Sequence, residues 1–468
     1  MKIALIQRGW YESIGLMSLA ALVKQHGHQV EAFIGSGEKD IAATILRYRP
    51  DIACFTCTTG EHIWAIAVGR ELKRRGSIFT IFGGPHPTFF PDLIEEEGVD
   101  CVCRGEGEYP LLDLVQAFAR GEGMTLIPNL YFKSPQGVLG NEPRALIGDL
   151  DSLPFPAREI YDKYRPLQEN PTKHFVVSRG CPFQCSYCYN HLWKRIYAGK
   201  GPFLRFKSPE YALRELEDTR RRYKLGTVYF EDDVFIARKI WVKEFLHGYR
   251  SRINLPFICK VQANAVTEEV ADLLAAAGCY CVSLGIETGD EGLRRMVLNK
   301  QISDTQIIRA CRILKKRGIE ILTLNMMALP GETLSQALKT VALNTAVGAD
   351  HPWCSILQPY PNTGIEQYAV ERGLLEKSDH RDFNPVFFKD SPLKSPETAI
   401  LVRLQKYFYL AVKFPALMPL ISRLIELPIP FFDHAVFLIS FALLHKNSNR
   451  LSLREIIRFG WRNRKLYF

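Results

Sequence analysis

Three cysteines, Cys181, Cys185 and Cys188, lie close together in the segment CPFQCSYCYN. Thiolates at this spacing can bind one side of a metal centre without a ligand from distant parts of the chain. An iron–sulfur cubane needs four ligands, so three cysteines leave one iron open to a small molecule. A zinc knuckle is the alternative, but His191 comes too soon to complete one. The triplet therefore predicts a 4Fe–4S cluster with one open position.

The composition is that of an ordinary globular chain. The 468 residues are 47% hydrophobic and 24% charged, and this length provides for two or three domains. The opening MKIALIQ predicts a strand and does not resemble a signal peptide. Twelve cysteines without an export signal favour reduced thiols, so we expect a cytoplasmic protein.

Residues 1–122 alternate strand and helix five times. The apolar runs KIALI, QVEAFI, DIACFTC, IFTIFGG and DCVCRG predict buried parallel strands with helical stretches between them. This alternation predicts an α/β domain with a doubly wound, Rossmann-like sheet of five parallel strands. Its ligand would lie at the carboxyl ends of the strands.

Glycines and polar residues gather where these strands end. Glycine lets a backbone approach a bulky ligand closely, although tight strand-to-helix turns explain the same residues. His86 could reach a ligand, or it could cap local backbone. The candidate ligand contacts of this domain are Thr56, Thr58, Gly83, Gly84, His86, Gly105, Glu106 and Gly107.

Two further regions follow. Residues 123–172 are rich in proline and predict an ordered connector that fixes a spacing. Over residues 173–385 the alternation resumes six times, which falls short of the eight units of a closed barrel. We therefore predict a partial (β/α)6 TIM barrel whose active site lies at the carboxyl ends of its strands. The cysteine segment follows the first of them.

Polar residues also end the later barrel strands. Carboxylates at such positions suit a cationic ligand. Helix capping by Asp233 and a plain turn at Pro330 are the structural alternatives. The candidate contacts are Glu231, Asp232, Asp233, Gln262, Asn264, Glu287, Pro330 and Gly331.

Residues 386–468 predict a helical, basic region. Residues 401–468 hold 11 Lys or Arg against 3 acids, most of the net charge of +10. Its apolar helices are too short and too often broken by proline to span a membrane. They suit peripheral contact with the inner face of a membrane, or a helical cap on the barrel. A nucleic-acid partner is disfavoured because long apolar helices do not bind a phosphate backbone.

The cysteine motif, with Tyr187 just before its last cysteine, resembles the signature of the radical S-adenosylmethionine (SAM) superfamily. This resemblance implies that the open iron chelates SAM and that Tyr187 packs near the adenine. It also implies that the acids from Glu231 to Asp233 hold the methionyl ammonium. Glu287 would contact the ribose, and Pro330 and Gly331 would lie on the adenine side.

The N-terminal loops resemble those of the cobalamin-binding domain that precedes many radical SAM barrels. The resemblance implies cobalamin as a third cofactor. One departure concerns the loop after the first strand, from Gln7 to Ser13, which lacks the histidine of the family's cobalt-ligating motif. A histidine from that loop therefore cannot ligate cobalt, and the domain could also have lost the cofactor.

The resemblance implies a cobalamin-dependent radical SAM methyltransferase that acts on an unactivated carbon of a small-molecule or lipid substrate. An external electron donor of the flavodoxin or ferredoxin type would reduce the cluster. A cyclase or other rearrangement enzyme with the same cofactors is the alternative. A non-catalytic cobalamin sensor is disfavoured because a sensor has no use for an open iron.

Overall fold

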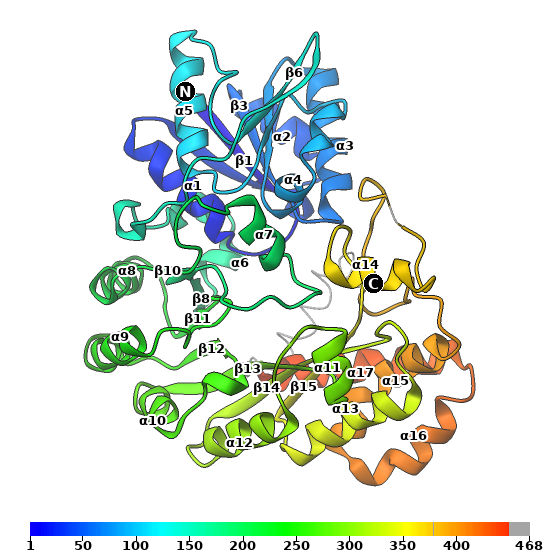
Figure 1. The fold of residues 1–468 in the computed structure, drawn as a ribbon. Helices are drawn as coiled ribbons and strands as arrows, with labels where there is room; N and C mark the ends of the chain where they lie inside the picture. Colours follow the sequence, from blue (N-terminus) through cyan, green and yellow to red (C-terminus); the bar gives the residue numbers. More distant parts are fainter. Residues whose placement is uncertain (378, 449–468) are drawn as a thin grey trace. The chain divides into compact units, whose positions relative to one another are not determined.

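The computed structural model describes residues 1–377 and 379–448. The fold divides into two compact units. Of the described residues, unit 1 comprises 1–176, 192–225 and 379–385, and unit 2 comprises 177–191, 226–377 and 386–448. Each is described by itself below, and Figure 1 gives the labels of the helices and strands.

Unit 1 contains a seven-stranded sheet in the order β2-β1-β3-β4-β5-β6-β7. The first five strands are parallel, as predicted. The predicted count of five is wrong, because β6 and β7 extend the sheet by antiparallel pairing. These two come from the expected connector, where the turn at Gly137 closes a hairpin. The strands are β1 (Lys2–Gln7), β2 (Gln29–Ile34), β3 (Ile52–Thr56), β4 (Phe79–Gly83), β5 (Cys101–Cys103), β6 (Leu130–Ser134) and β7 (Gly137–Gly140).

Helices cover both faces of this sheet. Ile3 and Leu5 of β1 pack in one apolar core with α1 and α5, while Ala4 and Ile6 pack in a second core with α2 and α3. Successive side chains of a strand point to opposite faces, so one strand supplies both cores. The sheet is therefore doubly wound, as the sequence predicted. The helices are α1 (Ile14–Gln25), α2 (Ile41–Tyr48), α3 (Glu61–Arg75), α4 (Pro85–Phe89) and α5 (Glu108–Arg120).

The later part of the expected connector packs on unit 1. Tyr161 is 1% exposed, and its hydroxyl donates to Gln7 Oε1 at 2.5 Å. The hydroxyl of Tyr164 accepts from the amide of Ile34 at 2.9 Å. These contacts hold the segment against the first two strands, next to α6 (Arg165–Gln168).

The second sheet has six strands in the order β15-β14-β13-β12-β11-β8. Its pairings from β11 to β15 are parallel. The strand number agrees with the predicted partial barrel, and its last five strands lie where they were predicted. The first predicted run, from His174 to Gly180, is broken into β8 and the separate two-residue strand β9 (Ser178–Arg179). The strands are β8 (Thr172–Phe175), β11 (Thr227–Phe230), β12 (Phe257–Val261), β13 (Cys279–Glu287), β14 (Glu320–Met327) and β15 (His351–Ile356).

Capping side chains set the starts of three helices in this part of the chain. Ser208, Thr267 and Thr333 each accept a backbone N–H with the side-chain oxygen, which satisfies an otherwise orphaned donor. The helices of this part of the chain are α7 (Asn190–Ile196), α8 (Pro209–Arg222), α9 (Lys239–Arg252), α10 (Glu268–Ala276), α11 (Glu291–Met296), α12 (Asp304–Lys315), α13 (Leu334–Ala346) and α14 (Gly364–Glu371).

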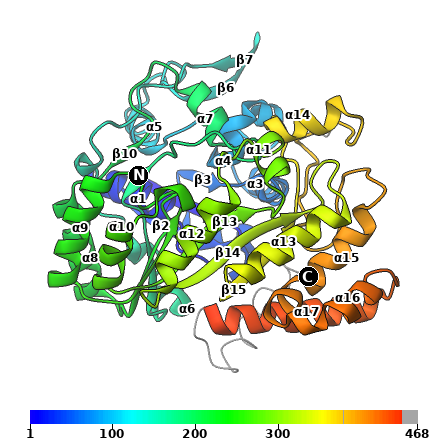
Figure 2. The same ribbon diagram turned by 60° about the horizontal axis from the view of Figure 1, so that its bottom comes forward.

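Three helices end the described chain: α15 (Thr398–Lys413), α16 (Met418–Leu424) and α17 (Pro430–Ser448). Helices α15 and α17 contact the edge strand β15 and each other, as Figure 2 shows. They cover an edge that would otherwise offer unpaired backbone groups. Among the described residues, no helix is long and apolar enough to cross a membrane. The predicted basic and aromatic end, from Arg450 to Lys465, lies outside the described residues.

Candidate functional site

The three cysteines of the motif differ from all the others in exposure. Cys181, Cys185 and Cys188 are partly exposed, whereas the other nine cysteines of the chain are buried. The nine buried thiols include Cys54, Cys101 and Cys103 of the first sheet. Buried thiols pack inertly, and a cluster must be reached by its ligand, so this contrast fits the motif cysteines as cluster ligands.

Backbone contacts hold the cysteine segment in place. The amide of Ser186 donates to the carbonyl of Leu298 at 3.0 Å, and its hydroxyl donates to the carbonyl of Val297 at 2.6 Å. The side-chain amide of Asn299 donates to the carbonyl of Gln184 at 2.8 Å. The loop between the cysteines is therefore anchored to the segment after α11.

The protein environment alone disfavours thiolates at this position. Burial raises the pKa of Cys181 to about 11, with the Asp233 carboxylate adding to the effect. Burial also raises the pKa of Cys185 and of Cys188. A metal centre deprotonates a coordinating thiol outright. The three thiols would therefore become thiolates when a metal centre binds them, and they are the ligand type that an iron–sulfur cluster needs.

The three acids after β11 occupy three different environments. Glu231 Oε2 lies 2.6 Å from Lys260 Nζ, so its charge is already paired. Asp232 is 2% exposed and accepts the backbone amides of Val177 and Ser178 at 3.1 and 2.5 Å. It therefore fixes the strand that leads into the cysteine segment.

Asp233 is exposed and faces the cysteine segment. Its Oδ2 accepts from the side-chain amide of Asn190 at 3.1 Å. The same amide group lies 3.4 Å from Cys188 Sγ. Of the three acids, Asp233 is the one that faces the motif. Its carboxylate could therefore pair with a cationic group bound at the open iron.

Glu287 ends β13 in a buried ion pair. Its Oε1 lies 2.8 Å from Lys300 Nζ, and the two side chains are 10% and 7% exposed. A Cβ at Gly285 would lie 2.2 Å from Glu287 Oε1, so only glycine leaves room for the pair. The Tyr187 hydroxyl hydrogen-bonds with Glu287, and burial, together with this carboxylate, raises the pKa of Tyr187. The predicted ribose and adenine contacts are therefore brought together.

Two adjacent strand ends adopt left-handed backbone at residues other than glycine. The φ angles are 68° at Glu287 and 58° at Ala328. Such conformations cost free energy and cluster at ligand sites.

A buried carboxyl group, that of Glu332, lies in the turn after β14. Its Oε2 accepts from the amide of Leu329 at 3.0 Å, and burial raises the pKa of Glu332 to about 8.

The other predicted SAM contacts differ in exposure. Gln262 is 7% exposed, and its Oε1 has no hydrogen-bond partner in the described part of the chain. Asn264 and Gly331 are exposed, and Pro330 is buried. A ligand group that donates to Gln262 would satisfy its orphaned oxygen.

In unit 1, the glycine pair after β4 packs against its own chain. Gly84 has a φ of 97°, and a Cβ there would lie 2.9 Å from Thr56 Oγ1 and 3.0 Å from the carbonyl of Cys57. A Cβ at Gly83 would meet nothing closer than 3.8 Å. The need for glycine at Gly84 is therefore explained by the chain itself, while Gly83 keeps space beside it.

His86 is fully buried in an aromatic stack. Its ring lies 3.7 Å from that of His62, at an interplanar angle of 13°. Its Nδ1 lies 3.1 Å from the hydroxyl of Thr59, while Nε2 has no partner among the described residues. Burial and the two neighbouring histidines, His62 and His380, lower the pKa of His86 to about 2, so the ring is neutral.

The loop after β5 is held by unit 1 itself. Glu106 pairs with Arg205 at 3.0 Å in a buried position, and its Oε2 accepts from the amide of Ile147. A Cβ at Gly105 would lie 1.8 Å from the hydroxyl of Tyr197. Thr58, by contrast, is exposed and donates to Glu61 at the start of α3. Gly107 is partly buried.

Three residues with clear roles at these sites were not predicted. Lys260 is a charged residue within the apolar strand FICKV, and that anomaly could have revealed it. Lys300 and Glu332 lie in turns with no distinguishing pattern. Their roles depend on packing against residues that the sequence does not place beside them.

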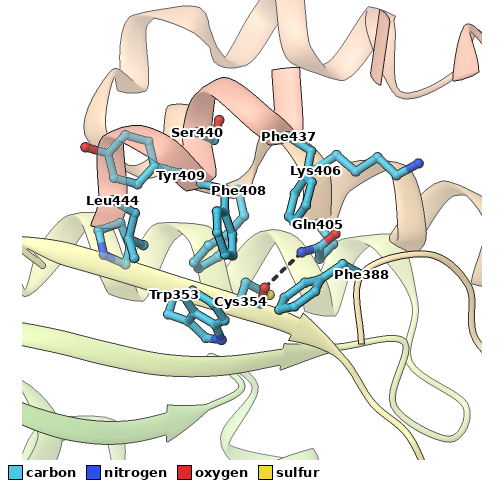
Figure 3. A pocket seen from close by; sticks show the side chains of 12 residues that line it. Trp353, Cys354, Phe388, Gln405, Lys406, Phe408, Tyr409, Phe437, Ser440 and Leu444 are labelled. Carbon is cyan, nitrogen blue, oxygen red and sulfur yellow. Dashed lines mark hydrogen bonds between the residues drawn. The ribbon is translucent and has the colours of Figure 1, made fainter. Parts of the chain in front are cut away.

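A small cavity lies between β15, α15 and α17 (Figure 3). Its volume is about 30 Å³, which is room for one or two water molecules and too little for a substrate. Gln405 Nε2 donates to the carbonyl of Cys354 at 2.9 Å on one side. The helices therefore pack on β15 rather than enclose a chamber. The walls are formed by Pro352, Trp353, Cys354, Phe388, Gln405, Lys406, Phe408, Tyr409, Phe437, Ser440, Phe441 and Leu444.

Comparisons with known proteins agree with both sites. Residues 175–343 match the radical SAM superfamily, and residues 8–115 match the B12 binding domain. An uncharacterized methyltransferase of Pyrococcus horikoshii is 30% identical over 383 residues, which cover 80% of this chain and 82% of the relative. The anaerobic magnesium-protoporphyrin IX monomethyl ester cyclase of Rubrivivax gelatinosus is 25% identical over 402 residues, covering 81% and 69%.

The fold has a solved counterpart in the cobalamin-dependent SAM radical enzyme OxsB. The TM-score is 0.71 over 99% of this chain and 75% of that one, at 16% identity. Fold, site and relatives together define the class. The chain belongs to the family of radical SAM enzymes that carry a B12-binding domain. Its cofactors are a 4Fe–4S cluster, SAM and cobalamin, as predicted.

Proposed function

We propose that this methyltransferase-like radical enzyme methylates an unactivated carbon of a small-molecule substrate. The observation that carries the proposal is the set of three partly exposed cysteines beside Asp233 and the Tyr187–Glu287–Lys300 group, in a chain that also has a B12-binding domain. When bound, the three cofactors supply one-electron cleavage of SAM to a hydrogen-abstracting radical and a carrier for the methyl group. An external flavodoxin- or ferredoxin-type protein would provide the electron.

The residues of the chain position and shield these groups. Asp233 is the best-placed carboxylate for the methionyl ammonium, because Glu231 is paired with Lys260 and Asp232 is buried. Glu287 and Gln262 offer oxygens to hydroxyl or amino groups of SAM, and Tyr187 lies beside Glu287. The partly buried apolar side chain of Tyr187 helps to exclude water from the site.

A ring-closing or rearranging enzyme is the second candidate. The similarity to the cyclase over 81% of this chain favours it. Both functions would use the same cluster site, so the product distinguishes them. Methyl transfer consumes SAM in two ways and yields S-adenosylhomocysteine together with 5′-deoxyadenosine, whereas a cyclase yields no S-adenosylhomocysteine.

The loops after β3, β4 and β5 would hold cobalamin without a histidine ligand to cobalt. The loop after β1 has no histidine, and the side chain of Gln7 donates to the carbonyls of Gly9 and Tyr11 at 2.7 Å each. His86 is buried against His62. Electron paramagnetic resonance of the cob(II) protein is expected to show no nitrogen splitting from the protein. A nitrogen triplet that disappears in His86→Ala would contradict this assignment.

We propose that the C-terminal helices contact lipid, either a lipid substrate or the surface of a membrane. Large apolar side chains are exposed on the C-terminal helices, including Leu420 at 54%, Phe431 at 89% and Ile439 at 58%. Aromatic and apolar side chains of this kind bind at the headgroup boundary of a bilayer. The protein would then be cytoplasmic and peripheral at the inner membrane face.

Vesicle sedimentation tests the lipid contact. Phe431→Ser is expected to weaken binding to anionic vesicles, whereas Leu126→Ser changes a residue exposed to a similar extent (83%) in unit 1 and should have no effect. Equal binding by both variants and the parent protein would contradict the contact.

Turnover with methyl-labelled SAM tests the reaction. The reconstituted, reduced enzyme is incubated anaerobically with lipid and soluble extracts, and labelled products are identified by mass spectrometry. We expect one labelled methyl group per product, with S-adenosylhomocysteine and 5′-deoxyadenosine formed together. Altered substrate with 5′-deoxyadenosine but without S-adenosylhomocysteine would favour the cyclase instead.

A further inference from the structure

A thiol, a carboxylate and an imidazole converge at the beginnings of three neighbouring strands in unit 2. Cys281 lies near the start of β13, Glu320 begins β14 and His351 begins β15. One ligand atom from each lies within 4.8 Å of the other two. The predicted SAM contacts follow the opposite, carboxyl ends of these strands, so this group is separate from the cofactor site.

The strand register explains the convergence. Cys281 pairs with Glu320 across β13 and β14, and Leu322 pairs with His351 across β14 and β15. Residues two apart on a strand share a face, so Glu320 lies on the same face as Leu322 and hence as His351. Regular pairing therefore directs all three side chains to one side of the sheet.

The burial of the group is unusual for polar side chains. Cys281 is 1% exposed and His351 is 5% exposed, whereas the side chain of Glu320 is 34% exposed and opens the group to solvent. His351 Nε2 lies 2.9 Å from Glu320 Oε2. His351 Nδ1 is buried and has no hydrogen-bond partner among the described residues. A buried polar atom without a partner is costly, and a ligand would offset that cost.

We propose that Cys281, Glu320 and His351 bind one zinc ion. Thiolate, imidazole and carboxylate are the donor types that zinc takes in a tetrahedral site, with water in the fourth position on the exposed side. Tetrahedral zinc places such donors about 3.3–3.6 Å apart. His351 Nε2 and Glu320 Oε2 are 2.9 Å apart and all three ligand atoms lie within 4.8 Å of one another, so small side-chain shifts would form the site. Cys281 differs from the nearby Cys279 because Glu320 and His351 lie beside it on the neighbouring strands.

The zinc ion would stabilise the fold by linking three neighbouring strands. Strand β15 is the edge strand of the second sheet, and the three ligands would tie it to β13 across β14. A ligand that binds only the folded state adds stability by mass action. Burial, with the charge of Glu320, raises the pKa of Cys281, so zinc binding releases a proton and weakens in acid.

The test uses the full chain with its iron–sulfur cluster loaded, so that the motif cysteines are occupied. Zinc is added, and the protein is then dialysed against a weak chelator. The zinc content per chain is measured by elemental analysis. The zinc X-ray absorption edge then gives the ligand shell. We expect about one zinc per chain with one sulfur at about 2.3 Å and nitrogen or oxygen at about 2.0–2.2 Å.

His351→Gln and Cys281→Ala are each expected to lose this zinc, while Cys279→Ala, a neighbouring buried cysteine, retains it. The variants' iron content and circular dichroism show whether each remains folded; if Cys281→Ala does not fold, His351→Gln decides. A shell of three sulfurs would place zinc at emptied cluster cysteines and overturn the proposal. Absence of zinc at stoichiometric levels, or zinc that survives His351→Gln, would also overturn it.

Discussion

The ammonium of Lys300 lies 2.8 Å from Oε1 of Glu287 and 2.7 Å from the carbonyl of Gly285. This pair is buried, and it fixes a carboxylate whose backbone is left-handed. Loss of one partner of a buried ion pair leaves an uncompensated charge and costs about 3–5 kcal/mol. We therefore expect Lys300→Met to lower the free energy of unfolding by about 3 kcal/mol and to weaken SAM binding.

The matched control is the pair Lys339–Asp290, which has the same 2.8 Å separation but a Lys339 side chain that is 58% exposed. Lys339→Met should cost less than about 1 kcal/mol, because solvent screens the exposed ammonium and the Asp290 carboxylate keeps its hydrogen bond from the amide of Leu293. Urea unfolding measures both variants. In the double variant Glu287→Gln/Lys300→Met the cost should be smaller than the sum of the single costs, and additive costs would show that the pair is not coupled.

Glu332 makes stability depend on pH in the direction opposite to most carboxylates. Burial raises the pKa of this carboxyl to about 8, so the folded state holds a proton that the unfolded chain has already lost. Its contribution is present at low pH and is lost as the pH rises through about 8. From about pH 6 to about pH 8, the parent protein should lose roughly 2 kcal/mol relative to Glu332→Gln.

Unfolding curves across this range measure the difference. Glu376→Gln, at an exposed carboxylate paired with Lys394, serves as the control and should run parallel to the parent protein. Identical pH dependence of the parent protein and Glu332→Gln would show that Glu332 is ionised throughout.

Gly84 and Gly83 provide a matched pair in the loop after β4. Gly84→Ala places a Cβ 2.9 Å from Thr56 Oγ1 on backbone with a φ of 97°, so we expect a loss of roughly 2 kcal/mol. Gly83→Ala meets no atom within 3.8 Å and should unfold close to the parent protein. If Gly83→Ala nevertheless weakens cobalamin binding, measured by visible absorption, the free space there serves the ligand. Equal unfolding of both variants would contradict the strain at Gly84.

The regular elements were predictable because local patterns and packing agree. The runs FICKV and YCVSLGIE become β12 and β13, Thr267 caps α10 after β12, and Thr333 caps α13 after β14. The hairpin of β6 and β7 was missed because β7 is exposed along its length and its turn contains proline and glycine. Exposed strands lack the apolar run on which such a prediction depends.

The sequence predicted which residues belong to the site, but not which partner each of them binds. The string from Glu231 to Asp233 shows three equivalent acids, and only folding assigns Lys260 to the first and the amides of Val177 and Ser178 to the second. These partners lie about 30 to 55 residues away in the sequence. Contacts of that range follow from strand order and register, which local sequence patterns do not contain.

The cysteine motif is tested most directly by iron content and SAM cleavage after anaerobic reconstitution. The parent protein should bind about four irons per chain and, when reduced, convert SAM to 5′-deoxyadenosine. The variant with Cys181, Cys185 and Cys188 all changed to Ala keeps the nine buried cysteines and should do neither. A full cluster or continued 5′-deoxyadenosine formation in that variant would contradict the assignment.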